Sequence, residues 1–270
     1  MIKEFFGTPI EPFKRNTLEL LKHQQDILDI LLIHAKQGGF SLVVGKPGTG
    51  KSVLRKAIEK IGDDRKDYVV TTILRTLHTY SMILKQIVDA QGISIPKGML
   101  KETEKKIISE VFNWHSQGKK IITIIEEAHL INFEVLKRLR LLFDSFPRNH
   151  NIILFAQNDI FRDLKKNVHA DIRSRITFSA KMESLNDEQI KNYIQNEIEL
   201  AQLPQNVFDD NAIYLILKSA EGNLRLARNL CYGSLVETVN LKQRIVTNQM
   251  VNRVLVQPHW TMPDEIIQEK

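Results

Sequence analysis

The segment Gly45-Lys46-Pro47-Gly48-Thr49-Gly50-Lys51-Ser52 constrains the fold of this chain more than any other stretch. It matches the pattern G-x-x-x-x-G-K-[ST], the phosphate-binding P-loop. An apolar, β-branched run at 40–44 precedes it, and a run at 53–58 with the pattern of a helix follows it. Strand, loop and helix in this order are the context in which the pattern binds phosphate, so we predict a nucleotide-binding α/β fold.

The chemistry of this loop comes from its glycines, its lysine and its serine. The glycines allow the backbone to curl so that its N–H groups point at phosphate oxygens, and the N-terminus of the following helix adds partial positive charge. We expect Lys51 to reach the β- and γ-phosphates and Ser52 to hold Mg²⁺ through its hydroxyl. The alternative is a glycine-rich turn that binds nothing. The residues predicted to contact the nucleotide here are Gly45, Pro47, Gly48, Thr49, Gly50, Lys51, Ser52 and Val53.

Composition limits the class of protein and its partners. The 270 residues are enough for one large domain or two modest ones. A net charge of +6 and a pI of about 9.2 permit binding to nucleic acid or to an anionic membrane. The one cysteine, Cys231, lies in an apolar helical run and excludes an internal disulfide, which favours a cytoplasmic protein. No apolar run approaches the roughly 18 residues of a membrane span, and the first residues lack the pattern of a signal peptide.

Apolar periodicity divides the chain into an α/β part and a helical part. Strands are predicted at 40–44, 68–73, 121–125, 151–156 and 176–179, and helices at 17–35, 53–58, 80–90, 101–116, 132–146 and 160–166. This alternation predicts a parallel five-stranded αβα sandwich. After about residue 180 only helices are expected, the first capped by Asn186 and the others at 209–220, 223–238 and 247–256. We therefore expect a helical lead-in (1–36), a nucleotide-binding domain (37–180), a small all-α lid (181–256) and a tail (257–270).

Two carboxylates follow the most apolar of the predicted strands. Glu126 and Glu127 come directly after 121–125, and ligands of open α/β sheets lie beyond the carboxyl ends of the strands. A P-loop enzyme needs one carboxylate for the Mg²⁺ shell, assigned to Glu126, and one to orient or deprotonate the attacking water, assigned to Glu127. The alternative is two surface glutamates at the start of a helix. No histidine or cysteine spacing indicates another metal, so the predicted cofactors are ATP and Mg²⁺.

Four further polar residues are candidates for the same reaction. Gln157 follows the 151–156 strand, where an amide can position water beside the γ-phosphate; a turn starter is the alternative. Arg175, and Arg173 as second choice, precede the last strand and are candidates for an arginine finger aimed at a neighbour's γ-phosphate. Arg225 begins the third lid helix and is expected to contact the nucleotide. Ordinary surface arginines are the alternative for all three.

Taken in order, these features resemble an AAA+ ATPase. The resemblance assigns 45–52 to Walker A, 121–127 to Walker B, Gln157 to sensor 1, Arg175 to the finger and 222–225 to sensor 2. Within AAA+ the chain is similar to the ExeA/GspA-type branch and to TniB/TnsC/MuB-type transposition ATPases. That similarity is carried by Phe6-Gly7 with Pro12-Phe13, by Glu126-Glu127-Ala128-His129, by Gln157, by Arg175-Ile176-Thr177 and by Gly222–Arg225. The chain departs from the branch at Glu126, Ala156 and Leu224, where Asp, Gly and Pro are usual.

The resemblance implies a nucleotide-switched homo-oligomer with ATP shared between subunits. Glu126 in place of Asp implies slow hydrolysis. ExeA-type proteins continue beyond the ATPase into a membrane span, whereas this chain ends where the ATPase ends; with the basic charge, this favours a transposition helper that assembles on double-stranded DNA and recruits a transposase. DNA contacts would be lysines and arginines on phosphates. Arg75, Lys119 and Lys120 are candidates, with ordinary surface cations as the alternative.

Two other functions fit the same residues. One is a secretion or envelope-assembly ATPase that acts with a membrane partner, as the ExeA/GspA resemblance allows. The other is an ATP-binding scaffold that barely hydrolyses, because of Glu126. A DEAH-type helicase, suggested by Glu126–His129, is disfavoured because 270 residues are too few for a second motor domain.

Overall fold

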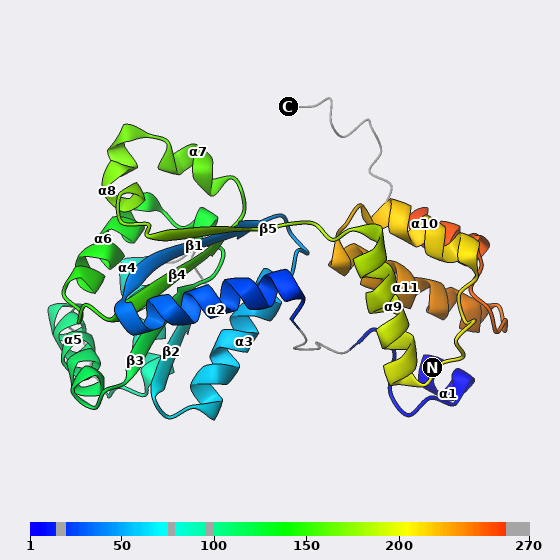
Figure 1. Cartoon of the computed structure of the whole chain (residues 1–270), viewed down its shortest axis with the longest axis horizontal. Helices are drawn as coiled ribbons and strands as arrows, with labels where there is room; N and C mark the ends of the chain where they lie inside the picture. The colour runs from blue at the N-terminus through cyan, green and yellow to red at the C-terminus, as the bar shows by residue number, and fades with distance from the viewer. Residues whose placement is uncertain (15–19, 75–78, 95–99, 258–270) are drawn as a thin grey trace. The chain divides into compact units, whose positions relative to one another are not determined.

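The protein is described by a computed structural model that covers residues 1–14, 20–74, 79–94 and 100–257. Contacts divide the chain into two compact units. An α/β unit comprises Leu18–Lys46 and Gly50–Met182, and a helical unit comprises Met1–Thr17, Pro47–Thr49 and Glu183–Lys270. Both are visible in Figure 1.

The α/β unit contains a five-stranded parallel sheet in the order β2-β3-β4-β1-β5. The strands are β1 (Gly39–Gly45), β2 (Tyr68–Ile73), β3 (Lys120–Ile125), β4 (His150–Ala156) and β5 (Phe178–Met182). β3 and β4 are almost wholly buried, which is why both are read from the sequence as continuous apolar runs. The predicted parallel α/β sheet is therefore confirmed.

Helices cover both faces of the sheet, and alternate strand residues face each layer. α2 (Lys22–Gln37) and α3 (Lys51–Asp64) pack on the face that carries Val43, Ile124 and Phe155. α4 (Tyr80–Gln91), α5 (Leu100–Ser116) and α6 (Phe133–Asp144) pack on the face that carries Leu42 and Leu154. Because side chains alternate along a strand, one apolar run supplies both cores.

Some predicted details of the α/β unit are wrong. The apolar spacing of 101–116 predicts Phe112 on the core side of that helix, but Phe112 is 48% exposed and Trp114 on the same helix is buried. The helix expected over 160–166 is shorter, α7 (Ile160–Leu164), and is followed by the 3-10 turn η2 (Asn167–His169) and α8 (Ala170–Arg173), which the sequence did not indicate. The last strand begins two residues later than expected. Asn16 and Thr17, either of which could cap the helix expected over 17–35, lie outside the described residues, and α2 begins at Lys22.

The helical unit contains the four expected helices. They are α9 (Asp187–Ala201), α10 (Asp210–Ala220), α11 (Leu224–Asn240) and α12 (Asn248–Leu255), with the short α1 (Ile2–Phe6) beside α11. The capping box predicted at Asn186 is present: its side chain accepts from Gln189 N, and Gln189 Oε1 accepts from Asn186 N. Cys231, which lies in the apolar run of α11, is buried.

The beginning of the chain is part of the helical unit. Phe13 is buried and has a positive φ of 57°, and its backbone N–H donates to Glu197 Oε2 at 3.0 Å. Its ring makes edge contacts with Tyr193 and Phe208. The buried carboxylate of Glu197 thus has a partner from a segment 184 residues away, which ties the lead-in to the core of this unit.

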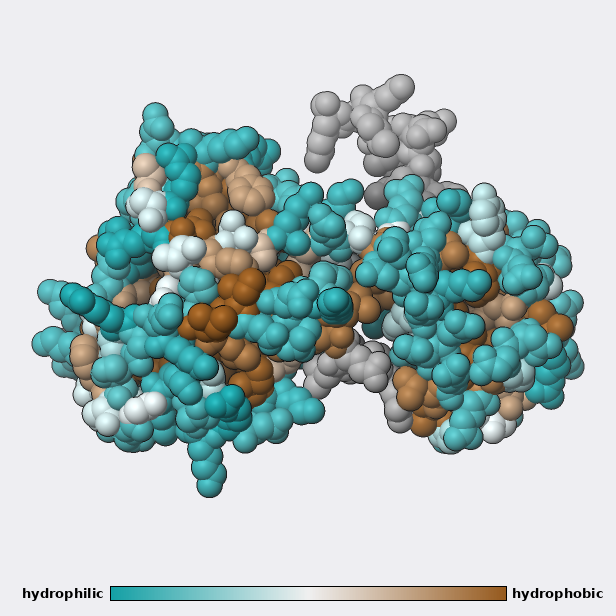
Figure 2. Space-filling view, in the orientation of Figure 1, coloured by the Kyte–Doolittle hydropathy of each residue, from teal (hydrophilic) through white to brown (hydrophobic). Residues whose placement is uncertain are grey.

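The surface of the α/β unit is mostly hydrophilic, with an apolar strip in the region of α2 in the view of Figure 2. On that helix Ile30 is 38% and Ile33 52% exposed. In the part of the chain that the structure describes, none of the helices is long and apolar enough to span a membrane.

His150 gives the fold a measurable dependence on pH. It is buried at the start of β4 against the rings of Phe143 and Phe146, and its Nε2 lies 2.8 Å from Thr123 Oγ1. Burial lowers the pKa of His150 to about 3, from an ordinary value of 6.5. Between these values the unfolded chain binds a proton that the folded chain does not, so stability falls as pH falls below about 6.5.

We expect His150→Gln to flatten this dependence. Glutamine retains an amide for Thr123 but does not titrate. The free energy of unfolding from urea titrations between pH 7 and 5 should lose a slope of up to about 1.4 kcal/mol per pH unit in the variant. An equal slope in both proteins would contradict the assignment, whatever the variant's absolute stability.

Candidate functional site

The candidate phosphate site lies at the carboxyl edge of the sheet. β1 ends at Gly45, α3 begins at Lys51, and β3 ends just before Glu126. All five strands are parallel, so these ends share one edge. Gly50, at the N-cap of α3, has φ 93°, and a Cβ there would lie 2.3 Å from Gln24 Nε2 of α2. Glycine is favoured here by the backbone conformation, and any side chain would also have to displace the amide end of Gln24.

Lys51 lies inside the loop. Its side chain is buried, and its ammonium donates to the carbonyls of Gly45 at 2.7 Å and Lys46 at 2.9 Å. These bonds hold a positive charge within the curve of the loop at the start of a 14-residue helix. The donors therefore fit a polyphosphate, which is bound by backbone N–H groups, a lysine and a helix N-terminus.

Ser52 and Glu126 form a pair of oxygen ligands beside this lysine. Ser52 Oγ donates to Glu126 Oε1 at 3.2 Å, and the Glu126 side chain is 16% exposed. A hydroxyl and a carboxylate are hard oxygen donors of the kind that Mg²⁺ takes from P-loop proteins, with phosphate oxygens and water completing the shell. The two residues assigned to the metal from sequence thus lie in contact and suit it.

A group that the sequence reasoning missed lies behind Glu126. Arg55, one turn into α3, has its Nε 3.1 Å from Glu126 Oε1. Its Nη1 contacts both carboxylate oxygens of Glu59, at 2.6 and 2.5 Å. Glu59 also accepts from Thr72 Oγ1 of β2 at 2.7 Å. The spacing of Arg55 and Glu59 is the ordinary four-residue helix pair, so the sequence carried no signal that Glu126 would join it.

Glu127, His129 and Gln157 form a second small group at this edge. Glu127 has φ 50° and ψ 41°, an unusual conformation for a residue with a side chain, and such strain is concentrated at functional sites. Gln157 N donates to His129 Nδ1 at 3.3 Å, and the same Nδ1 lies 3.5 Å from Glu127 Oε2. His129 Nδ1 therefore lies within reach of both the Glu127 carboxylate and the strand end that carries Gln157.

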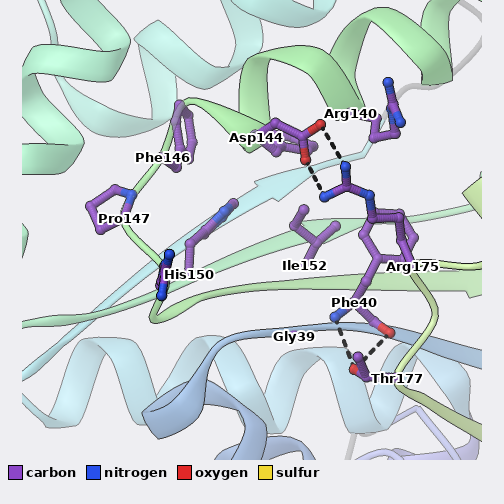
Figure 3. A pocket seen from close by; sticks show the side chains of 12 residues that line it. Gly39, Phe40, Arg140, Asp144, Phe146, Pro147, His150, Ile152, Arg175 and Thr177 are labelled. Atoms are coloured by element: carbon purple, nitrogen blue, oxygen red, sulfur yellow. Dashed lines mark hydrogen bonds and ion pairs between the residues drawn. The ribbon is translucent and has the colours of Figure 1, made fainter.

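The arginines before β5 lie at the opposite, amino edge of the sheet. Arg175 makes a bidentate pair with Asp144 at the end of α6, with distances of 2.7 and 3.1 Å, beside a cavity of about 300 Å³ (Figure 3). The cavity is also lined by Phe40 and His150, from the first residues of β1 and β4. Arg173 instead donates to the carbonyls of Leu164 and Lys165 after α7. Both arginines are exposed, but Arg175 pairs with a carboxylate, while Arg173 bonds to the carbonyls at the end of a helix.

The remaining predicted residues are one arginine of the helical unit and three candidates for DNA contact. Arg225, in the helical unit, is exposed in the first turn of α11, where its N–H donates to the capping Asn223. Lys120 starts β3 at the amino edge, where it pairs with Asp67 at 2.7 Å and lies over the ring of Tyr68. Lys119 precedes it and is partly exposed. Arg75 lies outside the described residues.

This combination defines a class of protein. A parallel sheet in the order β2-β3-β4-β1-β5, a P-loop between β1 and α3, and carboxylates directly after β3 form the core of a P-loop nucleotide-binding fold.

Comparison with known proteins specifies the fold further. Residues 33–164 match the AAA domain family. Over 250 residues the chain is 22% identical to General secretion pathway protein A of Aeromonas hydrophila. This alignment covers 87% of this chain and 44% of that protein. Among solved structures it is similar to Cdc6p from Pyrobaculum aerophilum, with a TM-score of 0.74 and 15% identity over 94% of this chain and 72% of the other. It is also similar to the Aeropyrum pernix ORC1 protein in complex with DNA, with a TM-score of 0.66 and 16% identity. That similarity covers 89% of this chain and 67% of the ORC1 chain.

The chain has the AAA+ P-loop fold followed by a helical region, as predicted. The AAA domain match and the similarity to General secretion pathway protein A agree with the predicted AAA+ fold and with the resemblance to ExeA-type proteins. The chain spans less than half the length of that relative. The relationship to TniB/TnsC/MuB-type ATPases stays a prediction.

Glu127→Gln tests the assignment of the water-activating carboxylate. The amide cannot take a proton, so we expect ATP turnover to fall about 10²- to 10⁴-fold while nucleotide affinity stays within about twofold of wild type. Steady-state phosphate release and equilibrium binding of a fluorescent ATP analogue measure the two quantities. Wild-type turnover no faster than that of Glu127→Gln would favour the scaffold function.

Proposed function

We propose that this protein binds and hydrolyses ATP with Mg²⁺ as a homo-oligomer, and that its ATP-bound form binds double-stranded DNA and regulates or recruits a transposase. The observation that carries the shared-site part is the position of Arg175. It lies at the amino edge of the sheet, beside the first residues of β1, while Lys51 follows the last residue of that strand. The seven residues of β1 span roughly 20 Å at 3.3 Å each, further than an arginine side chain reaches. Arg175 therefore serves a neighbouring subunit.

The roles of the other residues follow from the phosphate edge. Lys51 and the loop N–H groups hold the β- and γ-phosphates, and Ser52 and Glu126 hold Mg²⁺, partly through water. The metal supplies positive charge against the phosphate oxygens. Glu127 takes the proton of the attacking water, and Gln157 orients that water. Arg225 contacts the nucleotide from the lid. In this proposal 37–180 forms the nucleotide-binding domain and 181–256 the lid.

The DNA part of the proposal has separate support. The chain has a net charge of +6, and the ORC1 structure that it resembles is a complex with DNA. Lysines and arginines on phosphates would give binding that is independent of sequence. Arg75, Lys119 and Lys120 remain candidates, although Lys120 would have to exchange its pairing with Asp67 for a phosphate.

Two alternatives are supported by specific observations. The similarity to General secretion pathway protein A supports an ATPase that acts in secretion or envelope assembly with a membrane partner. The pairing of Glu126 with Arg55 supports an ATP-binding scaffold with slow hydrolysis, because the carboxylate meant for the metal shell is already near a cation.

Mixing two inactive variants tests the shared site. We expect Lys51→Ala, which cannot hold nucleotide, and Arg175→Ala, which lacks the finger, each to lose ATP turnover by at least about 10³-fold. Mixed in equal amounts, they should recover a substantial fraction of activity, because an intact Arg175 from one subunit meets an intact Lys51 from the next. Lys60→Ala on the exposed face of α3 is the control. If the mixture stays inactive while the Lys60→Ala protein works, Arg175 acts within its own subunit or not at all.

Duplex binding as a function of salt tests the DNA part. With a non-hydrolysable ATP analogue we expect tight binding at low salt that weakens by about 10³-fold between 50 and 200 mM salt if about six phosphates are contacted. Without nucleotide, and in Lys51→Ala, binding should be weak at all salt concentrations. Fluorescence anisotropy of labelled duplexes of unrelated sequence measures it. Failure to bind at low salt with the analogue present would leave the secretion alternative as the stronger one.

A further inference from the structure

Arg55 has an unusual place for a cation, because it lies within the group proposed to hold a metal ion. It is 12% exposed, and it stands between two carboxylates, Glu59 and Glu126. Glu126 Oε1 is shared: the hydroxyl of Ser52 donates to it at 3.2 Å and Arg55 Nε lies 3.1 Å away. The same oxygen thus faces a metal ligand on one side and a guanidinium on the other.

The guanidinium is anchored from the side away from the site. Its Nη1 is held by both oxygens of Glu59, and Glu59 is held in turn by Thr72 of β2. Its Nε is buried and, among the described residues, has no partner in hydrogen-bond geometry. The contact of Nε with Glu126 is therefore mainly electrostatic, and its strength depends on how firmly Glu59 holds the rest of the group.

The length of Glu126 makes this contact possible. The branch that the chain resembles usually has Asp at this position, and its carboxylate would lie one methylene nearer the backbone, further from Arg55. A carboxylate beside a guanidinium attracts a divalent cation less strongly, because the fixed positive charge repels the metal and neutralises part of the ligand's charge.

We propose that Arg55 sets the magnesium affinity of the ATP site by competing with the metal for Glu126, with Glu59 setting how strongly it competes. This proposal rests on the Mg²⁺–ATP site proposed above and adds how its metal affinity is set. The metal binds only when its attraction for the Glu126 carboxylate exceeds that of Arg55. Arg55 does not contact the nucleotide in this scheme and acts through Glu126.

Two variants with opposite expected effects test this. Arg55→Gln keeps a hydrogen-bonding group but removes the charge, so the dissociation constant of the metal should fall about tenfold. Glu59→Gln weakens the anchor and frees the guanidinium to engage Glu126, so the constant should rise about threefold. A general loss of structure would weaken metal binding in both. Arg65→Gln, which removes an exposed pair with Asp67 away from the site, is the matched control and should change nothing.

Mn²⁺ is the probe, because its free form gives an electron paramagnetic resonance signal that disappears on binding. Mn²⁺ is titrated into a mixture of the full chain and a non-hydrolysable ATP analogue, with the protein in excess over the analogue. The analogue without protein is titrated in parallel. In a Glu126→Asp background the effect of Arg55→Gln should shrink to less than about threefold, because the shorter side chain no longer meets Arg55.

The outcomes separate this inference from the proposed function. If the wild type holds Mn²⁺ with the analogue, but Arg55→Gln leaves the constant unchanged or raises it, Arg55 is structural and only the inference is wrong. If the wild type holds Mn²⁺ no better than the analogue alone, the metal–ATP site itself is wrong, and the inference is wrong with it.

Discussion

The contact between Ser52 and Glu126 is the interaction on which the rest of the site depends. It joins the first turn of α3 to the end of β3 at a distance of 3.2 Å. Neither residue has reason to be near the other unless β1 and β3 are parallel and separated by one strand, with a tight loop between β1 and α3. The sheet order, the two positive-φ glycines of the loop and the buried strands all serve to bring this hydroxyl and this carboxylate together.

Much of this arrangement is predictable from the chain. A continuous apolar run such as 121–125 reports burial on both faces, and residues at the ends of parallel strands share one edge. That is enough to place Glu126 and Gln157 beside the P-loop without knowing the strand order. The first lid helix was equally predictable, because Asn186 marks its first turn as a capping residue.

The parts that sequence could not supply depend on distant pairings. Arg55 with Glu59 is an ordinary helix pair, and only the fold adds Glu126 to it. Phe13 enters the sequence analysis only through the family resemblance, and only the fold shows that its N–H donates to the buried Glu197. Phe112 and Trp114 differ by about 200° around the helix axis and so lie on nearly opposite faces, and the stripe that packs in the fold is the one through Val111 and Trp114.

The position of Arg175 also sets how a neighbour could use it. Its bidentate pair with Asp144 is half open to solvent: the two side chains are 50% and 33% exposed. Pairs of this kind contribute at most about 1 kcal/mol, whereas a phosphate offers the same guanidinium more negative charge and an equally good bidentate fit. A γ-phosphate presented at this edge would therefore outcompete Asp144. The ion pair with Asp144 keeps Arg175 ordered in the single subunit, but it is weak enough for Arg175 to exchange Asp144 for a phosphate. An arginine that is paired in its own chain therefore remains suited to act in another.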